Sequence, residues 1–211
     1  MPLPRPEDRP PKAAAIRQAG PADREALIDT LVRAFADDPM YTWLTAQDSR
    51  FDERYRRLFG AYLDHLAFPH GQVWATEDLK ATALWAPPGC WELGLWQQLR
   101  FAPDWVQVLG LKNLWSRWRA VDHIQSRHPH IPHWYLMVIG ADPEVQGQGR
   151  ASALMKPVLE VADQMQVGAF LETPKESNIP IYERFGFRVT EEIHIKNGPT
   201  LWLMWRDPQS L

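Results

Sequence analysis

The segment that most constrains the fold is a nearly continuous apolar run from Trp134 to Ala141, which leads into a glycine-containing loop. A run without alternating polar residues is typical of a strand that is buried on both faces of a sheet. Beyond the loop, apolar residues recur on one side of a helix predicted from about Gly149 to Gln166. We therefore expect an α/β fold in which this strand lies inside the sheet and the loop joins it to the helix.

Shorter patterns predict the remaining elements. The dipeptide Asn197-Gly198 indicates a hairpin turn, and Asp37-Asp38-Pro39 is expected to end a first helix that begins near Pro21. Residues 91–125 are predicted to be mainly helical. Further helices are predicted over 52–66 and 178–185, and strands over 13–19, 73–76, 82–86, 168–173, 187–195 and 199–205.

The length of 211 residues and the 45% hydrophobic content predict a single domain with a full core, over residues 13–207. The proline-rich segment 1–12 is predicted to be a disordered tail. A helical insertion rich in tryptophan spans about 90–127. Its indole rings fit two interpretations, core packing and the wall of an apolar substrate site.

The charge balance argues against a nucleic-acid partner, since 23 basic and 26 acidic residues give a net charge of -3. The single cysteine, Cys90, cannot form an internal disulfide, which agrees with a reducing compartment. His128, His130 and His133 crowd together, but no acidic or cysteine ligand completes a zinc site, so no metal is expected. We expect no signal peptide, because no apolar segment follows the proline-rich start, and no membrane span, because no run of the roughly 18 apolar residues that a span needs is found. We expect a cytoplasmic protein without membrane contact, as a monomer or homodimer.

The loop between Ala141 and Ala151 is predicted to bind a phosphate group. Free N–H groups and the positive end of a helix dipole converge at the start of the helix, and glycines let the backbone approach a pyrophosphate. The loop lacks the third glycine of a Rossmann dinucleotide site and the Gly-Lys-Ser/Thr of a Walker loop. Taken alone, it also fits the ordinary start of a helix.

Two blocks together resemble the GNAT superfamily of N-acetyltransferases. The pattern Arg/Gln-x-x-Gly-x-Gly/Ala is matched from Gln146 to Ala151, and a later block holds Leu171-Glu172-Thr173, Asn178, Tyr182 and Gly186-Phe187. The likeness is strongest to the branch that includes puromycin N-acetyltransferase, and it covers most of the chain after the tail. It implies a GNAT fold, which is a mostly antiparallel, twisted sheet of about seven strands flanked by helices. The Trp-rich helical insertion would precede the fourth strand.

The resemblance implies acetyl-CoA as co-substrate and direct transfer of its acetyl group to an amine. The strand over residues 133–141 would pair with the pantetheine arm, and an N–H group of Val138 or Ile139 would polarise the thioester carbonyl. The coenzyme-binding residues implied are Val138, Ile139, Ala141, Gln146, Gly147, Gln148, Gly149, Arg150, Ala151, Asn178 and Tyr182.

Two side chains are candidates for proton transfer. Tyr182 would protonate the leaving thiolate, because the reference pKa values of tyrosine and a thiol differ by only about 1.5 units. Glu172 would accept the amine proton, although a carboxylate at this position also fits a structural salt bridge. The walls of the acceptor site implied by the resemblance are Tyr41, Trp43 and Trp85.

The function expected from these features is acetylation of a primary amine on a small, partly apolar acceptor, puromycin-like or another amine. Two alternatives stay open. The chain would be a non-catalytic acyl-CoA-binding sensor module if transfer has been lost, or a protein N-terminal or lysine acetyltransferase if the acceptor groove is open.

Overall fold

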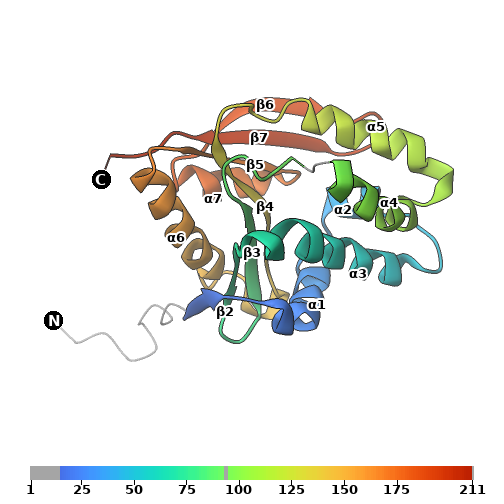
Figure 1. Ribbon diagram of the computed structural model, residues 1–211, viewed down its shortest axis with the longest axis horizontal. Helices are drawn as coiled ribbons and strands as arrows, with labels where there is room; N and C mark the ends of the chain where they lie inside the picture. The colour runs from blue at the N-terminus through green and yellow to red at the C-terminus, as the bar shows by residue number, and fades with distance from the viewer. Residues whose placement is uncertain (1–14, 93–94, 211) are drawn as a thin grey trace.

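The computed structural model describes residues 15–92 and 95–210. Within these ranges the strands form one sheet in the order β1-β2-β3-β4-β5-β7-β6, and only β4 and β5 run parallel (Figure 1). The strands are β1 (Ile16–Gln18), β2 (Val73–Thr76), β3 (Ala81–Ala86), β4 (His133–Ala141), β5 (Gly168–Thr173), β6 (Arg188–His194) and β7 (Thr200–Arg206). This confirms the predicted α/β fold with a mostly antiparallel sheet. The predicted tail, residues 1–12, lies outside the described residues.

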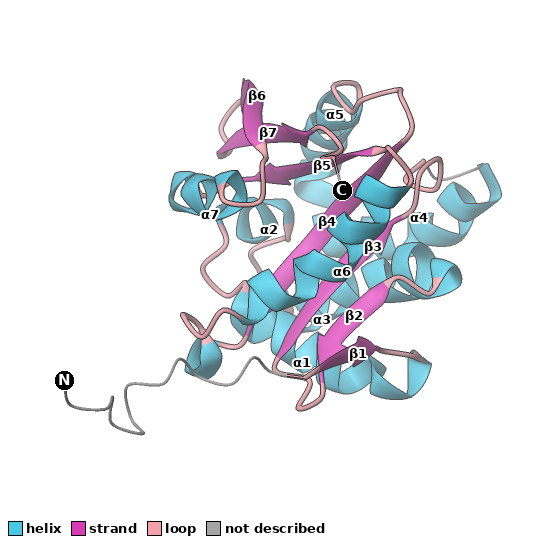
Figure 2. Cartoon of the chain, turned by 90° about the vertical axis from the view of Figure 1, so that its left-hand side faces the viewer, coloured by secondary structure: helices cyan, strands magenta, loops and turns pink. Residues whose placement is uncertain are grey.

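Helices cover both faces of this sheet. The helices are α1 (Arg24–Ala34), α2 (Pro39–Leu44), α3 (Phe51–Ala61), α4 (Leu95–Leu109), α5 (Leu114–Gln125), α6 (Arg150–Gln164) and α7 (Ile179–Glu183). Shorter helical turns are η2 (Pro21–Asp23), η3 (Tyr62–Ala67), η4 (Phe68–His70), η5 (Leu111–Asn113), η6 (Pro143–Val145) and η7 (Glu176–Asn178). Figure 2 shows α6 in front of β3 and β4, with α1 and α3 behind them.

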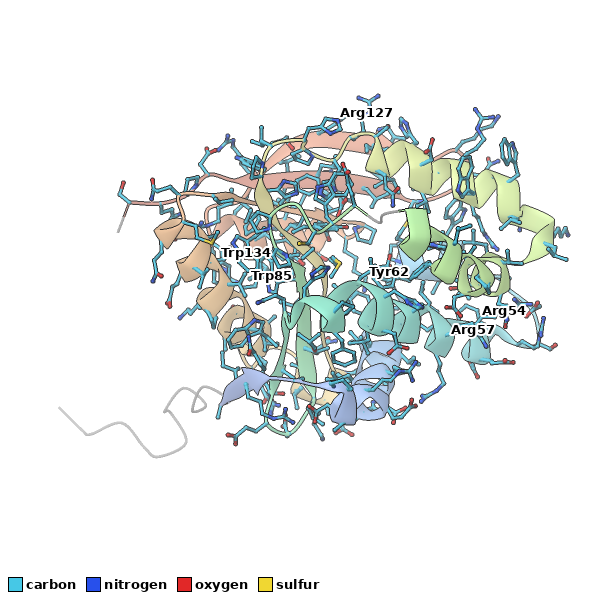
Figure 3. All side chains as sticks on the ribbon, in the orientation of Figure 1. Arg54, Arg57, Tyr62, Trp85, Arg127 and Trp134 are labelled. Atoms are coloured by element: carbon cyan, nitrogen blue, oxygen red, sulfur yellow. The ribbon has the colours of Figure 1, made fainter. Side chains whose placement is uncertain are left out.

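Each face of the sheet has its own apolar core, because successive side chains of a strand point to opposite faces. On one face, Leu84 packs in a cluster with Leu27 of α1. On the other, Trp85 and Trp134 pack with Leu154 of α6, and Figure 3 shows the two tryptophans next to one another. The α1/α3 face and the α6 face are therefore separate environments.

The segment Asp37-Asp38-Pro39 does more than end a helix, which corrects the sequence-based expectation. The first helix ends at Ala34, and Pro39 is the first residue of the additional helix α2. The Asp38 side chain caps α2 by accepting hydrogen bonds from the N–H groups of Met40 and Tyr41, both at 2.9 Å. Proline at the first helical position and aspartate before it are both signals for a helix start.

The tryptophan-rich segment is helical, as predicted, and is interrupted at Gly110, whose φ of +69° favours glycine. Trp115 and Trp118 on α5 are 68% and 50% exposed, and their rings stack with centroids 5.3 Å apart. Packing in the core therefore does not account for these two tryptophans.

Candidate active site

The central feature of the site is an opening between β4 and β5. Their parallel pairing runs from His133↔Gly168 to Leu136↔Leu171 and stops there, although β4 continues to Ala141. A bulge in the β3–β4 register leaves Met137 without its own partner, because Leu84 pairs with Val138 and Trp85 pairs with Leu136. Bulges bend a strand and increase its twist. From Met137 onward, β4 therefore pairs with β3 alone.

The alternation of hydrogen bonds along β4 determines which amides face this opening. The Asp142 N–H group donates to the Lys80 carbonyl, so the backbone groups of Asp142 point toward β3. Because the direction alternates along a strand, those of Gly140 and Val138 also point toward β3. The backbone groups of Ile139 and Ala141 therefore point away from β3, toward the opening. The Ala141 carbonyl agrees with this, since it accepts a hydrogen bond from the Gln146 side chain at 3.1 Å. Of the two amides considered for carbonyl polarisation, Ile139 has the required direction.

The glycine loop lies open at the end of β4. Gly147 and Gly149 have φ values of +76° and +73°, and a Cβ atom built on either glycine would meet nothing within 4 Å. Gly149 is the N-cap of α6, and no side chain of the described residues caps this helix start. The backbone amides at Gln148 to Ala151 therefore lie beside accessible space at the positive end of a 15-residue helix. A diphosphate fits the chemistry of this position.

Ion pairs hold both ends of the loop. At the end of β4, Asp142 accepts hydrogen bonds from the Glu144 N–H group at 3.0 Å and from Arg33 Nε at 2.6 Å. These two donors hold the pKa of Asp142 below its usual value. On the helix side, Arg150 pairs with Asp78 at 2.6 Å, so its side chain turns away from the loop. Burial alone would raise the pKa of Asp78, but hydrogen bonds from Arg150 and Thr76 lower it to about 2.

Tyr182 lies on the α6 face of the sheet, at the C-terminal part of α7. Its ring packs in the α6-side core and meets Phe187 edge-on, with centroids 6.2 Å apart. Burial and the charge of Asp38, and no hydrogen bond from the described residues, act on its hydroxyl. Burial, followed by the charge of Asp38, raises the pKa of Tyr182. Asn178 is tied to the end of β5, because its side-chain amide donates to Thr173 Oγ1 at 3.4 Å.

Glu172 lies just beyond the last β4–β5 pair, and its side chain is 11% exposed. Tyr41 of α2, Tyr62 of η3 and Tyr135 of β4 are the tyrosines whose hydroxyls respond to its charge. Burial raises the pKa of each of these tyrosines, and the Glu172 carboxylate raises it further. A buried carboxylate surrounded by phenol rings suits a cationic amine.

Sequence reasoning missed three members of this cluster. Tyr135 is two residues before Met137 on β4, and its partner in the register is Phe170, two residues before Glu172. The strand alternation could therefore have placed Tyr135 on the same face as Glu172. Tyr62 comes from η3, seen on the α3 side of the sheet in Figure 3, and His128 places Nδ1 3.8 Å from Glu172 Oε1. Nothing in the spacing of these two residues indicated the contact.

The three predicted acceptor-site walls lie in different places. Tyr41 joins the Glu172 cluster, and its ring centroid is 6.1 Å from that of Tyr62. Trp43 instead donates a hydrogen bond to the Asn197 carbonyl at 2.6 Å and lines a cavity of about 240 Å³ beside α5. Trp85 is fully buried in the α6-side core. Tyr41 and Trp43 thus pack against the core on the α1/α3 face, whereas Trp85 lies on the opposite face of the sheet.

Within residues 15–92 and 95–210, no group of three or more His, Cys, Asp or Glu side chains is placed to hold a metal ion. In the same part, the helices fall short of the length and apolar character needed to cross a bilayer.

Comparison with known proteins gives a consistent result. Residues 28–187 match the acetyltransferase (GNAT) family. An uncharacterized N-acetyltransferase of Schizosaccharomyces pombe is 26% identical over 216 residues, which cover 93% of this chain and 84% of that protein.

Two solved structures share the fold. The histone acetyltransferase HPA2 and related acetyltransferase from Corynebacterium glutamicum superposes with a TM-score of 0.69 at 21% identity, covering 95% of this chain and 99% of that chain. Arylalkylamine N-acetyltransferase 2 from Aedes aegypti gives a TM-score of 0.63 at 14% identity, covering 94% and 100%.

Proposed function

Because the chain belongs to the GNAT family of N-acetyltransferases, whose members use acetyl-CoA as co-substrate, we propose that it acetylates the primary amine of a small, partly apolar acceptor. The observation that carries the proposal is the opening between β4 and β5, with the bare glycine loop at one end and Glu172 at its edge. A co-substrate arm and an amine would approach each other there from the two faces of the sheet.

The binding roles follow from the directions of backbone groups. The amides of residues 147–151 would hold the diphosphate, and the outward-facing groups of Ile139 and Ala141 would pair with the pantetheine arm. The Ile139 N–H group would donate to the thioester oxygen as negative charge develops on it. Arg150 contributes through its backbone and through the Asp78 ion pair that fixes the helix start.

The two proton-transfer roles fall to residues on opposite faces of the sheet. Tyr182 would donate its hydroxyl proton to the thiolate, and its raised pKa keeps that hydroxyl protonated at neutral pH. Glu172 would accept a proton from the acceptor amine. The phenol rings of Tyr41, Tyr62 and Tyr135 supply the partly apolar surface against which a small acceptor would pack.

We propose a small-molecule acceptor because Glu172 is enclosed by aromatic side chains. One related structure is described as a histone acetyltransferase and another as an arylalkylamine N-acetyltransferase, so relatives include both protein and small-molecule acceptors. Glu172 is nearly buried and faced by aromatic side chains from α2, η3 and β4. A short amine reaches such a carboxylate more readily than a folded protein surface does.

A thiol-release assay with acetyl-CoA tests the proposal. The panel holds arylalkylamines, polyamines and puromycin, the last because a puromycin-like acceptor was expected from the sequence, beside lysine-containing and free N-terminal peptides. Small amines with an apolar group are expected to give the highest kcat/KM. Faster turnover of peptides would favour a protein acceptor. Calorimetric binding of CoA with no turnover across the panel would favour the sensor module.

A further inference from the structure

We propose that His128 is a positioning residue of the acceptor site that takes up, through Glu172, the first proton lost by an acceptor that arrives as an ammonium ion. The inference rests on the proposed amine acetylation. It starts from a buried chain of polar atoms that runs from Glu172 through His128 and His133 to the Ile131 carbonyl.

The hydrogen bonds of this chain fix the position of each proton. The Ile131 carbonyl only accepts, so the His133 Nδ1 atom, 2.7 Å away, must carry a hydrogen. Burial lowers the pKa of His133 to about 4, so the ring is neutral and its Nε2 atom is a bare acceptor. His128 Nε2 lies 2.8 Å from that atom and must donate to it. In a neutral His128 ring, Nδ1 therefore has no hydrogen, and this is the atom nearest Glu172.

This arrangement leaves one place for an added proton. A lone pair on His128 Nδ1 that faces a carboxylate 3.8 Å away is unfavourable, and a hydrogen on Nδ1 converts the repulsion into an attraction. The His128 ring also stacks on Trp91, with centroids 3.7 Å apart and planes at 24°. An indole face stabilises a cation. The site is thus built to hold imidazolium, although the ring is only 4% exposed.

The groups that face His128 come from each element packed against it. Glu172 on β5 supplies the negative charge, His133 and Tyr135 on β4 are neutral, and the apolar rings are Trp91 and Phe170. Tyr41 and Tyr62 lie around Glu172 and remain protonated because burial raises their pKa values. Of the facing groups, Glu172 is the one that exchanges a proton with His128.

The protons balance as follows. An ammonium acceptor loses one N–H proton to Glu172. The carboxylic acid passes it to His128 Nδ1 once the 3.8 Å gap between Oε1 and Nδ1 closes to hydrogen-bond distance, and Glu172 is again a carboxylate. The amine then attacks, the N–C bond forms, the C–S bond breaks, and the second amine proton replaces the one that Tyr182 gives to the thiolate. After the products leave, the stored proton returns through Glu172 to water. An acceptor that arrives as a neutral amine needs only the second transfer.

The first test does not depend on turnover. In protein with ¹⁵N-labelled histidine, spectra at high pH are expected to show His128 protonated at Nε2 and His133 at Nδ1. A neutral His128 protonated at Nδ1 would overturn the proposal.

The second test uses acceptor basicity. His128→Gln keeps an amide that can donate to His133 but cannot take up a proton. At pH 7 it should lose about tenfold or more in kcat/KM with a strongly basic amine, and less than about threefold with a weakly basic one that arrives neutral. His130→Gln, in the same loop and exposed, should leave both rates unchanged. An equal loss with both amines would indicate a structural role. If no amine is acetylated, the proposed function fails, whereas the spectra still decide the proton positions.

Discussion

Leu136 of β4 and Leu171 of β5 form the last pair of the parallel ladder, and beyond them the two strands separate. Ile139 and Ala141 then present backbone groups to the opening, and Glu172 follows Leu171 at its edge. One change of pairing thus supplies both a backbone surface for an extended ligand arm and a carboxylate beside it.

Gly149→Ala should weaken CoA binding. The residue has φ of +73° at the N-cap of α6, so an added Cβ both strains the backbone by about 1 kcal/mol and occupies the space expected for the diphosphate. We expect Kd for CoA to rise about tenfold or more, as measured by calorimetry. Gly71→Ala is the matched control, since φ is +63° and its Cβ would also meet open space. Equal CoA affinity in the two variants would contradict the assignment of the loop.

Tyr182→Phe should lower kcat by about 10²-fold or more, because the thiolate loses its proton donor. The melting temperature should change little, since no hydrogen bond from the described residues acts on the hydroxyl. Tyr55→Phe provides the opposite case. Its hydroxyl donates to the Phe35 carbonyl, so that variant should lose about 1 kcal/mol of stability and keep its kcat. Full turnover by Tyr182→Phe would rule out the general-acid role.

The pH dependence of kcat gives an independent check on Tyr182. Burial raises its pKa above the usual value of 10.0, so the hydroxyl stays protonated between pH 7 and 10. Deprotonation of Tyr182 should therefore cause no fall in kcat between pH 7 and 10. A loss of activity in this range that disappears in Tyr182→Phe would show that the phenol is less buried in solution.

Much of the fold could be predicted because short sequence patterns determine local backbone structure. The apolar run of β4, the glycine loop and the Asn197-Gly198 turn each depend on short-range rules. The helix α2 was missed because Asp38-Pro39 has the same composition as a helix end. The Asp38 side chain accepts hydrogen bonds from the N–H groups of Met40 and Tyr41, and these bonds identify the segment as the start of a helix.

The acceptor side of the site was less predictable for a different reason. Tyr62, His128 and Glu172 come from elements far apart in sequence, and only the packing of η3, the loop after α5 and β5 brings them together. The histidines could be recognised as a cluster, but their hydrogen-bond order, and hence the tautomer of each ring, depends on how the rings pack in three dimensions. For Trp85 the residue type alone was misleading. Tryptophan fits the wall of a substrate site, but the position of Trp85 on its strand places it in the α6-side core.

Asp163→Asn should destabilise the fold by about 3 kcal/mol in urea denaturation. Asp163 accepts two hydrogen bonds from Arg206, both at 2.7 Å, and Arg206 is 3% exposed, so the change leaves a buried cation without its counter-ion. Glu144→Gln removes an exposed pair with Lys80 and should cost less than about 1 kcal/mol. Similar losses in both variants would contradict the assignment of a buried ion pair.

The same pair gives a dependence of stability on pH. Hydrogen bonds from Arg206 lower the pKa of Asp163 below 3.8 in the folded state. Its contribution is therefore complete above that value and is lost as pH falls through the folded-state pKa. In acid titrations, the stabilities of the unmodified protein and Asp163→Asn should converge at the lowest pH at which both still fold.

Because of His133, the free energy of unfolding should decrease as the pH is lowered from 6.5 to about 4. Its folded-state pKa is lowered by burial to about 4, whereas the unfolded chain takes up a proton near 6.5. The unfolded state thus binds the extra proton first, and the free energy of unfolding should decrease by at most about 3 kcal/mol across this interval. Urea denaturation at pH 7.5 and 4.5 measures the decrease. His133→Gln should lack most of it, and the exposed His123→Gln should retain it. Should His133→Gln show the full decrease, the ring must be able to hold a proton inside the fold, and the direction of the hydrogen bond from His128 would have to be reversed.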